Sequence, residues 1–173
     1  MKKRFLRLAA AIILAALCLE MSAQVPAFRE KGYKGNVGIQ GLYLYVPGIT
    51  TSHGYMFNGV HYLGGGLSVA VTPSSDPTIV PAAFLEYQAY FLKRNSTPVA
   101  GVKLQGMAEL SDRPYYLAGL IPTFGWSWGI GTQKQFGIMP YLGIGAFYEI
   151  TRSKMHDSFT ALMLPILGVV FEF

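Results

Sequence analysis

The residues that could carry out chemistry are few. The chain has three histidines, His53, His61 and His156, and a single cysteine, Cys18. No HxH or HExxH spacing joins the histidines, so a metal site would need distant parts of the fold to converge. The sequence also lacks a phosphate-binding loop, a dinucleotide fingerprint and a calcium-loop pattern. We therefore expect no metal site and no cofactor.

The best arrangement for nucleophilic catalysis is a Ser/His/Asp set drawn from two segments. Ser52-His53 and His156-Asp157-Ser158 hold the residue types that an activated hydroxyl needs. With the N-terminus of the barrel in the periplasm, both segments are expected in or near loops outside the cell. However, neighbouring residues on a strand point to opposite faces, and the set matches no known spacing. We instead expect His53 to form hydrogen bonds in the barrel, and His61, His156 and the polar residues of the connecting segments to be solvated. We therefore expect no enzymatic activity.

The first 23 residues have the order of a secretory signal peptide. A basic start is followed by an apolar run of about a dozen residues, too short for a transmembrane helix, and then by Met21, Ser22 and Ala23. We expect cleavage after Ala23. Lipidation of Cys18 is the alternative, but Leu17 before it is larger than lipidation prefers. After cleavage the chain has no cysteine, so it has no disulfide.

The composition indicates a chain that meets lipid on part of its surface. Hydrophobic residues make up 51% of the 173 residues, and charged residues only 13%, against about a quarter in soluble domains. Without the signal peptide, ten basic and eight acidic side chains remain, a net charge of +2. No basic run interleaved with aromatic residues is present, so we expect no nucleic-acid partner.

Alternation with a period of two recurs along the rest of the chain and predicts strands. Pro47-Gly48 is predicted to end the first strand, and Asn58-Gly59 is a strong hairpin signal. The eight predicted strands are residues 34–46, 51–57, 61–72, 78–92, 97–110, 115–128, 136–150 and 159–173. Most of them exceed the 9–11 residues or so that a tilted transmembrane strand needs.

An even number of long strands predicts an antiparallel up-and-down transmembrane β-barrel. In lipid an open sheet edge would leave backbone groups unpaired, so the sheet must close on itself. Periodicity alone does not distinguish a membrane barrel from a soluble one. The signal peptide, the low charge and the aromatic strand ends favour the membrane. The predicted organisation is a signal peptide at 1–23, a periplasmic segment at 24–33 and the barrel at 34–173.

Along each predicted strand the polar residues lie mainly on one of the two faces, and this face is expected to line the barrel interior. Glu86 and Lys103 lie on adjacent strands around one turn and can pair across the lumen wall. The face expected to point inward also holds many glycines, which leave room for larger neighbouring side chains. Because side chains mostly fill the interior of an eight-stranded barrel, we expect no wide pore. The predicted lumen network is Glu86, Gln88, Lys103, Gln105, Glu109, Glu149 and Glu172.

Aromatic residues near strand ends are expected to face the two membrane interfaces. The candidates are Tyr43, Tyr45, Tyr116, Trp126, Trp128, Phe136, Tyr148, Phe171 and Phe173. Phe171 and Phe173 share the phase of Leu167 and Val169, whereas Glu172 points the other way. We expect Phe171 and Phe173 to form the signal that the barrel-insertion machinery of the outer membrane reads.

Three glycine- and tyrosine-rich segments carry a resemblance to a known family. Residues 31–35 (Lys-Gly-Tyr-Lys-Gly), residues 51–55 (Thr-Ser-His-Gly-Tyr) with Phe57-Asn58, and residues 62–66 (Tyr-Leu-Gly-Gly-Gly) are similar to the small, porin-like outer-membrane β-barrel proteins of Bacteroidetes. The resemblance implies the barrel fold and an outer-membrane location. It implies no activity and no catalytic residues.

These observations together predict an outer-membrane barrel with a structural or interaction role. Its expected partners are outer-membrane lipid and the insertion machinery, and we expect it to be a monomer. The connections expected outside the cell are short, which argues against a large binding surface. Three alternatives remain open: a membrane-embedded enzyme that modifies lipid A, a narrow channel, and a barrel that binds a small apolar ligand.

Overall fold

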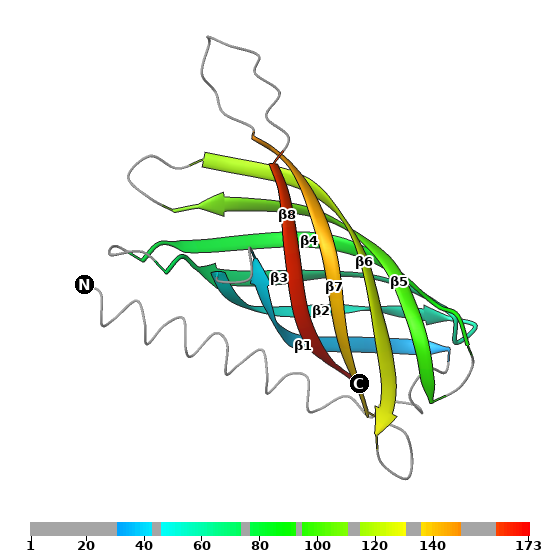
Figure 1. Cartoon of the computed structure of the whole chain (residues 1–173). Coiled ribbons are helices and arrows are strands. Elements are labelled where there is room, and N and C mark those ends of the chain that lie inside the picture. Colours follow the sequence, from blue (N-terminus) through cyan, green and yellow to red (C-terminus); the bar gives the residue numbers. More distant parts are fainter. Residues whose placement is uncertain are drawn as a thin grey trace.

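The computed structural model describes residues 31–42, 46–73, 77–92, 95–110, 115–130, 136–149 and 162–173. In these residues the chain forms eight antiparallel strands, each paired with its neighbours in sequence, and β8 pairs with β1 to close the barrel (Figure 1). The predicted fold class, an eight-stranded up-and-down β-barrel, is confirmed. No helix within the described residues has the length and apolar character needed to cross a membrane.

The strands are β1 (Gly32–Leu42), β2 (Val46–Phe57), β3 (His61–Val71), β4 (Ile79–Tyr90), β5 (Ser96–Glu109), β6 (Tyr115–Ile130), β7 (Phe136–Glu149) and β8 (Leu162–Glu172). We call the end where β1 begins and β8 ends the turn end. There the strands are joined by residues 58–60, 91–95 and 131–135. The other end, with the connections 43–45, 72–78, 110–114 and 150–161, is the loop end.

The first turn differs from its prediction. Pro47 and Gly48 were expected to end the first strand, but they lie inside β2, where Pro47 pairs with Gly41 of β1. The β2–β3 pairing begins only at Gly48, opposite Ala70. At Pro47, β2 is not yet paired with β3. The missing backbone N–H of proline therefore costs no hydrogen bond to β3, and proline is tolerated there.

Other boundaries also shift, and two of the shifts extend one end of a strand by two residues. β1 begins at Gly32 rather than at residue 34, and β6 continues to Ile130, beyond the expected end at Trp128. Both extensions keep their pairing, since Gly32 lies opposite Met56 and Ile130 opposite Phe136. Strand length is therefore set by the available partner as much as by the local sequence.

The hairpin predicted at Asn58-Gly59 is confirmed. Asn58 has φ 55° and Gly59 has φ 66°, the left-handed conformations that tight hairpin turns need. The N–H of Val60 donates to the carbonyl of Phe57 at 3.1 Å and closes the turn. This turn fixes the register of β2 against β3, and the register decides which side chains enter the lumen.

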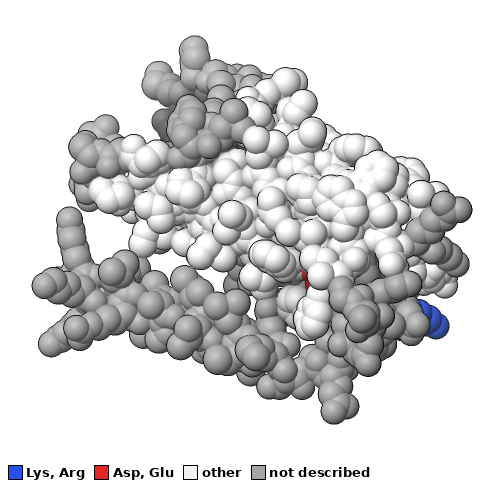
Figure 2. All heavy atoms as spheres, turned by 60° about the horizontal axis from the view of Figure 1, so that its bottom comes forward, with Lys and Arg blue, Asp and Glu red and all other residues white. Residues whose placement is uncertain are grey.

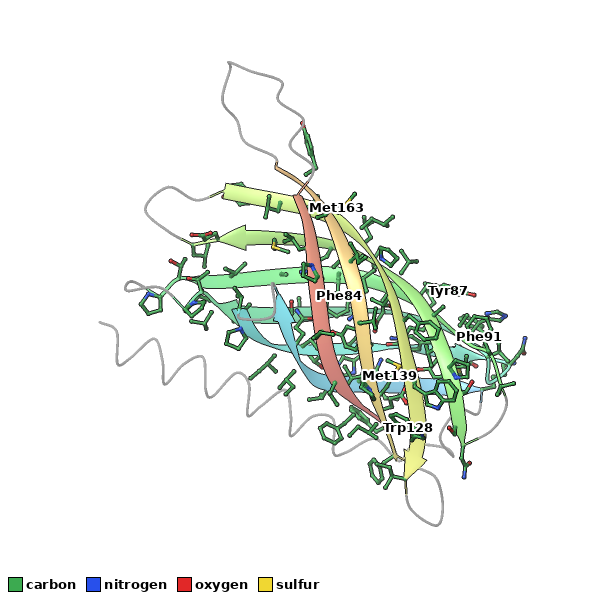
Figure 3. The ribbon with its side chains drawn as sticks, in the orientation of Figure 1. Phe84, Tyr87, Phe91, Trp128, Met139 and Met163 are labelled. Atoms are coloured by element: carbon green, nitrogen blue, oxygen red, sulfur yellow. The ribbon has the colours of Figure 1, made fainter. Side chains whose placement is uncertain are left out.

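The polarity of the barrel is inverted relative to a soluble protein. Large apolar side chains such as Leu67 (62% exposed) and Met163 (74% exposed) point outward, whereas Glu172 is fully buried. Figure 2 shows that the described surface of one face is almost entirely uncharged. In Figure 3, Phe84 and Met139 lie among the side chains inside the barrel, whereas Tyr87, Phe91, Trp128 and Met163 lie outside it.

Interior glycines make room for interior rings. Tyr62 is fully buried, and its hydroxyl lies where a side chain on Gly64 would begin. The Phe147 ring occupies the corresponding space at Gly119 and Gly145. Because these glycines have no side chain, an aromatic ring from the same strand or the next occupies the space. Side chains therefore fill the lumen, as expected for a barrel of eight strands.

Candidate functional site

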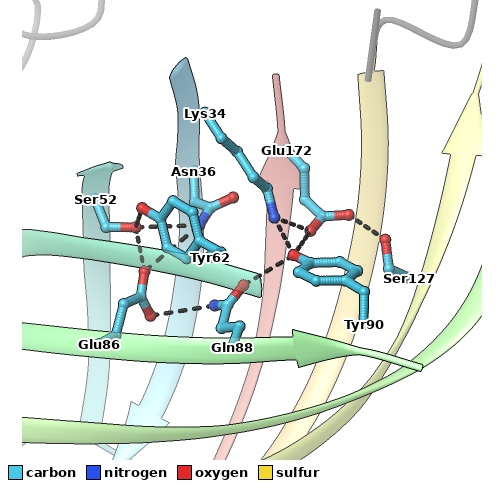
Figure 4. Close-up of polar contacts among 9 residues, drawn as sticks. All are labelled: Lys34, Asn36, Ser52, Tyr62, Glu86, Gln88, Tyr90, Ser127 and Glu172. Carbon is cyan, nitrogen blue, oxygen red and sulfur yellow. Dashed lines mark hydrogen bonds and ion pairs between the residues drawn. The ribbon is translucent and has the colours of Figure 1, made fainter. Parts of the chain in front are cut away.

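The lumen contains a polar network, and its centre at the turn end is the carboxylate of Glu172. Lys34 of β1 forms an ion pair with this carboxylate, with 2.7 Å between Nζ and Oε1. The hydroxyl of Tyr90, from β4, donates to the same oxygen, and the hydroxyl of Ser127, from β6, donates to Oε2. Three strands thus place polar groups around the fully buried carboxylate of a fourth strand, β8 (Figure 4).

A second cluster forms around Glu86 of β4. The hydroxyl of Ser52 donates to Oε1, and the side-chain amide of Asn36 lies 3.5 Å from the same atom. Oε2 accepts a hydrogen bond from the side-chain amide of Gln88 and lies 3.5 Å from Nζ of Lys103. Glu86 and Lys103 are direct partners in the β4–β5 register. Both carboxylate oxygens therefore have partners, as a buried charge requires.

The two clusters are joined into one network. The hydroxyl of Tyr90 lies 2.8 Å from Oε1 of Gln88, and the amide of Gln88 reaches Glu86. Tyr62 extends the network by donating from its hydroxyl to Ser52 at 3.3 Å. Figure 4 shows this chain of contacts running from Ser127 to Ser52 across the lumen. A connected network of buried polar groups holds a specific arrangement of its side chains.

Aromatic rings add to the solvation of the two buried ammonium groups. Nζ of Lys34 lies 4.2 Å from the ring centroid of Tyr90, and Nζ of Lys103 lies 4.9 Å from the centroids of both Phe84 and Tyr141. These distances are within the range of cation–π attraction. The rings therefore stabilise the lysines where water is excluded.

The charges described in the network cancel. Two lysines face two glutamates, and each lysine lies within ion-pair distance of one glutamate. The side chains of all four residues are at least nine-tenths buried. The cluster therefore offers no net charge to attract a permeating ion.

The structure brings together most of the predicted lumen residues. Glu86, Gln88, Lys103 and Glu172 belong to the network. Gln105 is also buried in the lumen, but its Nε2 has no hydrogen-bond partner among the described residues. Glu109 is only half-buried, because it is the last residue of β5 and lies at the loop end. The side chain of Glu149 lies outside the described residues.

Sequence reasoning missed more than half of the described network. The residues not singled out as network members are Lys34, Asn36, Ser52, Tyr62, Tyr90 and Ser127. The signal that could have found most of them is the period of two. Lys34 shares its phase with Asn36, and Tyr90 shares its phase with Glu86 and Gln88. Tyrosine was expected in the interface girdles, so its place in the lumen was overlooked.

The Ser52-His53 pair does not form a catalytic site. Ser52 is buried in the lumen, whereas His53 is exposed on the outer face. The His53 ring contacts the hydroxyl of Tyr33 through Nδ1 and the hydroxyl of Thr51 through Nε2, the latter at 3.3 Å. The expectation of a hydrogen-bonded His53 therefore holds, with both partners on the outside of the barrel.

The placement of His53 near an outer loop was wrong. His53 pairs with Gly35, and Gly35 exchanges backbone hydrogen bonds with Phe173, so His53 lies towards the turn end. Residues 156–158 lie outside the described residues, within the connection at the loop end.

The other described histidine, His61, begins β3 at the turn end. It was expected to be solvated, and it is exposed, but its Nδ1 lies 2.7 Å from the hydroxyl of Tyr87 and the two rings stack. No group of three or more His, Cys, Asp or Glu side chains among the described residues could hold a metal ion.

The aromatic residues predicted for the girdles point outward where they are described. They are Tyr116, Trp126, Trp128, Phe136, Tyr148 and Phe171, with Phe173 half-exposed. Tyr43 and Tyr45 lie outside the described residues. Tyr116 and Tyr148 are near the loop end, and the others are near the turn end, where Tyr33, Phe57 and Phe91 join them. Exposed aromatic side chains thus lie on several strands at the turn end, and on β6 and β7 at the loop end.

Two solved structures resemble this barrel. The N-terminal β-barrel domain of OprF from Pseudomonas aeruginosa aligns with a TM-score of 0.58 and 12% identity, over 83% of this chain and 100% of that one. Neisserial surface protein A aligns with a TM-score of 0.55 and 11% identity, over 82% of this chain and 94% of that one. No family model matches the sequence, and no curated protein matches it. The likeness supports the fold.

Proposed function

We propose that this chain is an integral outer-membrane barrel protein with a structural or interaction role, a closed lumen and no catalytic activity. The single observation that carries the proposal is the inverted polarity of the barrel, with apolar side chains outside and an ion-paired network inside. A soluble barrel would present such an outer surface to water. Lipid is the solvent that fits it.

The dimensions of the outer surface support a membrane-spanning role. Tyr116 and Trp128 both point outward from β6, twelve positions apart. At about 3.3 Å per residue and a tilt of about 40°, they lie about 30 Å apart along the barrel axis. Leu120, Phe124 and Trp126 fill the interval with exposed apolar or aromatic side chains. The apolar band of an outer-membrane barrel is about 25 Å tall between its girdles.

The finer assignments are part of the same proposal. We infer a signal peptide cleaved after Ala23, an outer-membrane location and membership of the small barrel proteins of Bacteroidetes. OprF and Neisserial surface protein A, which share the fold, support the location. We also propose that Phe171 and Phe173 are read by the insertion machinery, since Phe171 is exposed on the last strand.

The experiment expresses the full chain with its signal peptide in a Gram-negative host. We expect the protein in the outer-membrane fraction, with a gel mobility that changes on heating because a folded barrel resists detergent. A soluble periplasmic protein whose mobility does not depend on heating would contradict the membrane assignment.

Transport and catalysis are tested separately. In planar bilayers the purified barrel should give no ion conductance, because charged and aromatic side chains fill the lumen. Lipid A isolated from the same cells should have an unchanged mass spectrum. Steady conductance steps would favour the narrow channel, and a new lipid A species that disappears with His53→Ala would favour the enzyme.

A further inference from the structure

The outer surface at the turn end combines an exposed cation, an imidazole and aromatic rings on neighbouring strands. Lys31 is exposed and directly precedes Gly32, which pairs with Met56, the neighbour of Phe57. Phe57 in turn lies opposite His61 on β3. Lys31, Phe57 and His61 therefore follow one another across three adjacent strands, and Phe57 is 42% exposed between the other two.

The imidazole of His61 is oriented by a tyrosine. Nδ1 of His61 lies 2.7 Å from the hydroxyl of Tyr87, and the two rings stack with centroids 5.9 Å apart. When the hydroxyl donates to Nδ1, the ring proton is on Nε2, on the other side of the imidazole. His61 then presents a hydrogen-bond donor to the surroundings.

The position of this cluster relative to the membrane follows from the aromatic belt. Phe57 and His61 flank the turn at residues 58–60, at the same end of the barrel as Phe91, Trp128 and Phe136. These aromatic residues are the kind that lie at the level of lipid headgroups. Resting on the proposed membrane location, this places Lys31 and His61 at the headgroups of one leaflet.

The charge distribution in the sequence agrees with this placement. The connections at the turn end contain Lys93, Arg94 and Lys134 and neither aspartate nor glutamate, whereas those at the loop end contain three basic and three acidic residues. An excess of basic residues beside an interface attracts anionic lipid. The cluster of described residues therefore lies at the end of the barrel where the sequence is basic.

We propose that Lys31, Phe57, His61 and Tyr87 form a binding site for the phosphate of an anionic phospholipid in the leaflet at the turn end. The ammonium group of Lys31 provides a charge on a long flexible stem. His61 donates from Nε2 to a phosphate oxygen, and the Phe57 ring packs against the first carbons of the lipid. The two backbones that carry Lys31 and His61 are two strand spacings apart, about 10 Å, a gap that the lysine stem and one phosphate can bridge.

The test is native mass spectrometry of the full mature chain in detergent with two lipids that have identical acyl chains. Phosphatidylglycerol carries a net negative charge, and phosphatidylcholine does not. We expect the wild-type barrel to retain more phosphatidylglycerol. Lys31→Gln should lower the ratio of bound phosphatidylglycerol to phosphatidylcholine about fivefold, the effect of one basic side chain near anionic lipid. His61→Gln should lower it too, and Tyr87→Phe should lower it less.

The charge-matched control is Lys154→Gln, which removes the same charge from the connection at the loop end. It should leave the ratio unchanged. An equal loss in Lys154→Gln and Lys31→Gln would mean that total charge, and not this site, attracts the lipid. An unchanged ratio in Lys31→Gln and His61→Gln would also overturn the site.

Gel mobility before and after heating separates this inference from the proposed function. A barrel that changes mobility on heating and inserts into phosphatidylcholine vesicles, yet shows no preference for phosphatidylglycerol, overturns the headgroup site alone. A chain that does not insert into either lipid overturns the membrane assignment on which the site rests. Each variant must show the wild-type heat shift, so that a folding defect is recognised.

Discussion

The ring of Phe173 lies across the backbone of Gly35 at the seam where the last strand meets the first. The two residues exchange both backbone hydrogen bonds, at 2.7 and 2.9 Å. A side chain on Gly35 would begin within the space of the Phe173 ring. The glycine therefore leaves room for the ring at the seam, and the ring covers backbone that the glycine leaves bare.

This contact predicts that Gly35→Ala weakens barrel closure. The added methyl group displaces the Phe173 ring, and we expect a loss of about 1 kcal/mol in the free energy of unfolding, at the low end for overpacking because the ring can swing away. Urea unfolding of the refolded barrel in lipid vesicles measures the loss. Gly106→Ala is the control: a methyl group there meets no atom within 4 Å, and it should be neutral or slightly stabilising.

A double-mutant cycle identifies the cause of that loss. In a Phe173→Ala background, Gly35→Ala should cost almost nothing, because the ring that it displaces is already gone. An additive result would mean that Gly35 is needed for another reason, such as backbone conformation.

The ion pair of Lys34 with Glu172 predicts a larger effect. Glu172→Gln keeps the shape of the side chain but leaves the ammonium of Lys34 buried without its countercharge. We expect a loss of about 3–5 kcal/mol in the free energy of unfolding. Adding Lys34→Met should recover a large part of it, because the double variant has no unpaired charge. If the double variant is no more stable than Glu172→Gln, the pair is not the reason for the loss.

The membrane assignment predicts that the cost of a charge depends on depth. Leu120 and Ile130 both point outward from β6, Leu120 between the two aromatic levels and Ile130 at the turn end. Arginine should cost about 2–4 kcal/mol at Leu120 and about 0–1 kcal/mol at Ile130. Unfolding in lipid vesicles measures both values. Equal costs at the two positions would argue against lipid around the middle of the barrel.

The strand number and the two faces of each strand could be predicted from the sequence, because a period of two is a local property. Leu63, Leu67 and Val69 alternate with small or polar residues, and all three are exposed on the outer face. The prediction from local sequence was wrong at Pro47 and Gly48, because proline and glycine usually end strands. Their place inside β2 depends on the pairing with β1, which the sequence around them does not encode.

The site was only half predictable for a related reason. Glu86 and Lys103 are close in the chain and joined by one short turn, so their pairing follows from the hairpin. Lys34 and Glu172 are 138 positions apart. They meet only because β1 pairs with β8 in one particular register. That register is a property of the closed barrel, so no pattern within a single strand reveals the contact.

The separation of Lys34 from Glu172 along the chain means that a truncated barrel carries an unpaired charge. A ribosome makes Lys34 near the start of the barrel and Glu172 near its end, so every nascent or truncated chain that lacks β8 has a lumen lysine without its acid. Of the four charged residues in the network, such a fragment keeps Lys34, Lys103 and Glu86. An excess cation resists transfer into lipid, so we expect a chain that lacks β8 to insert into lipid vesicles less readily than the full barrel.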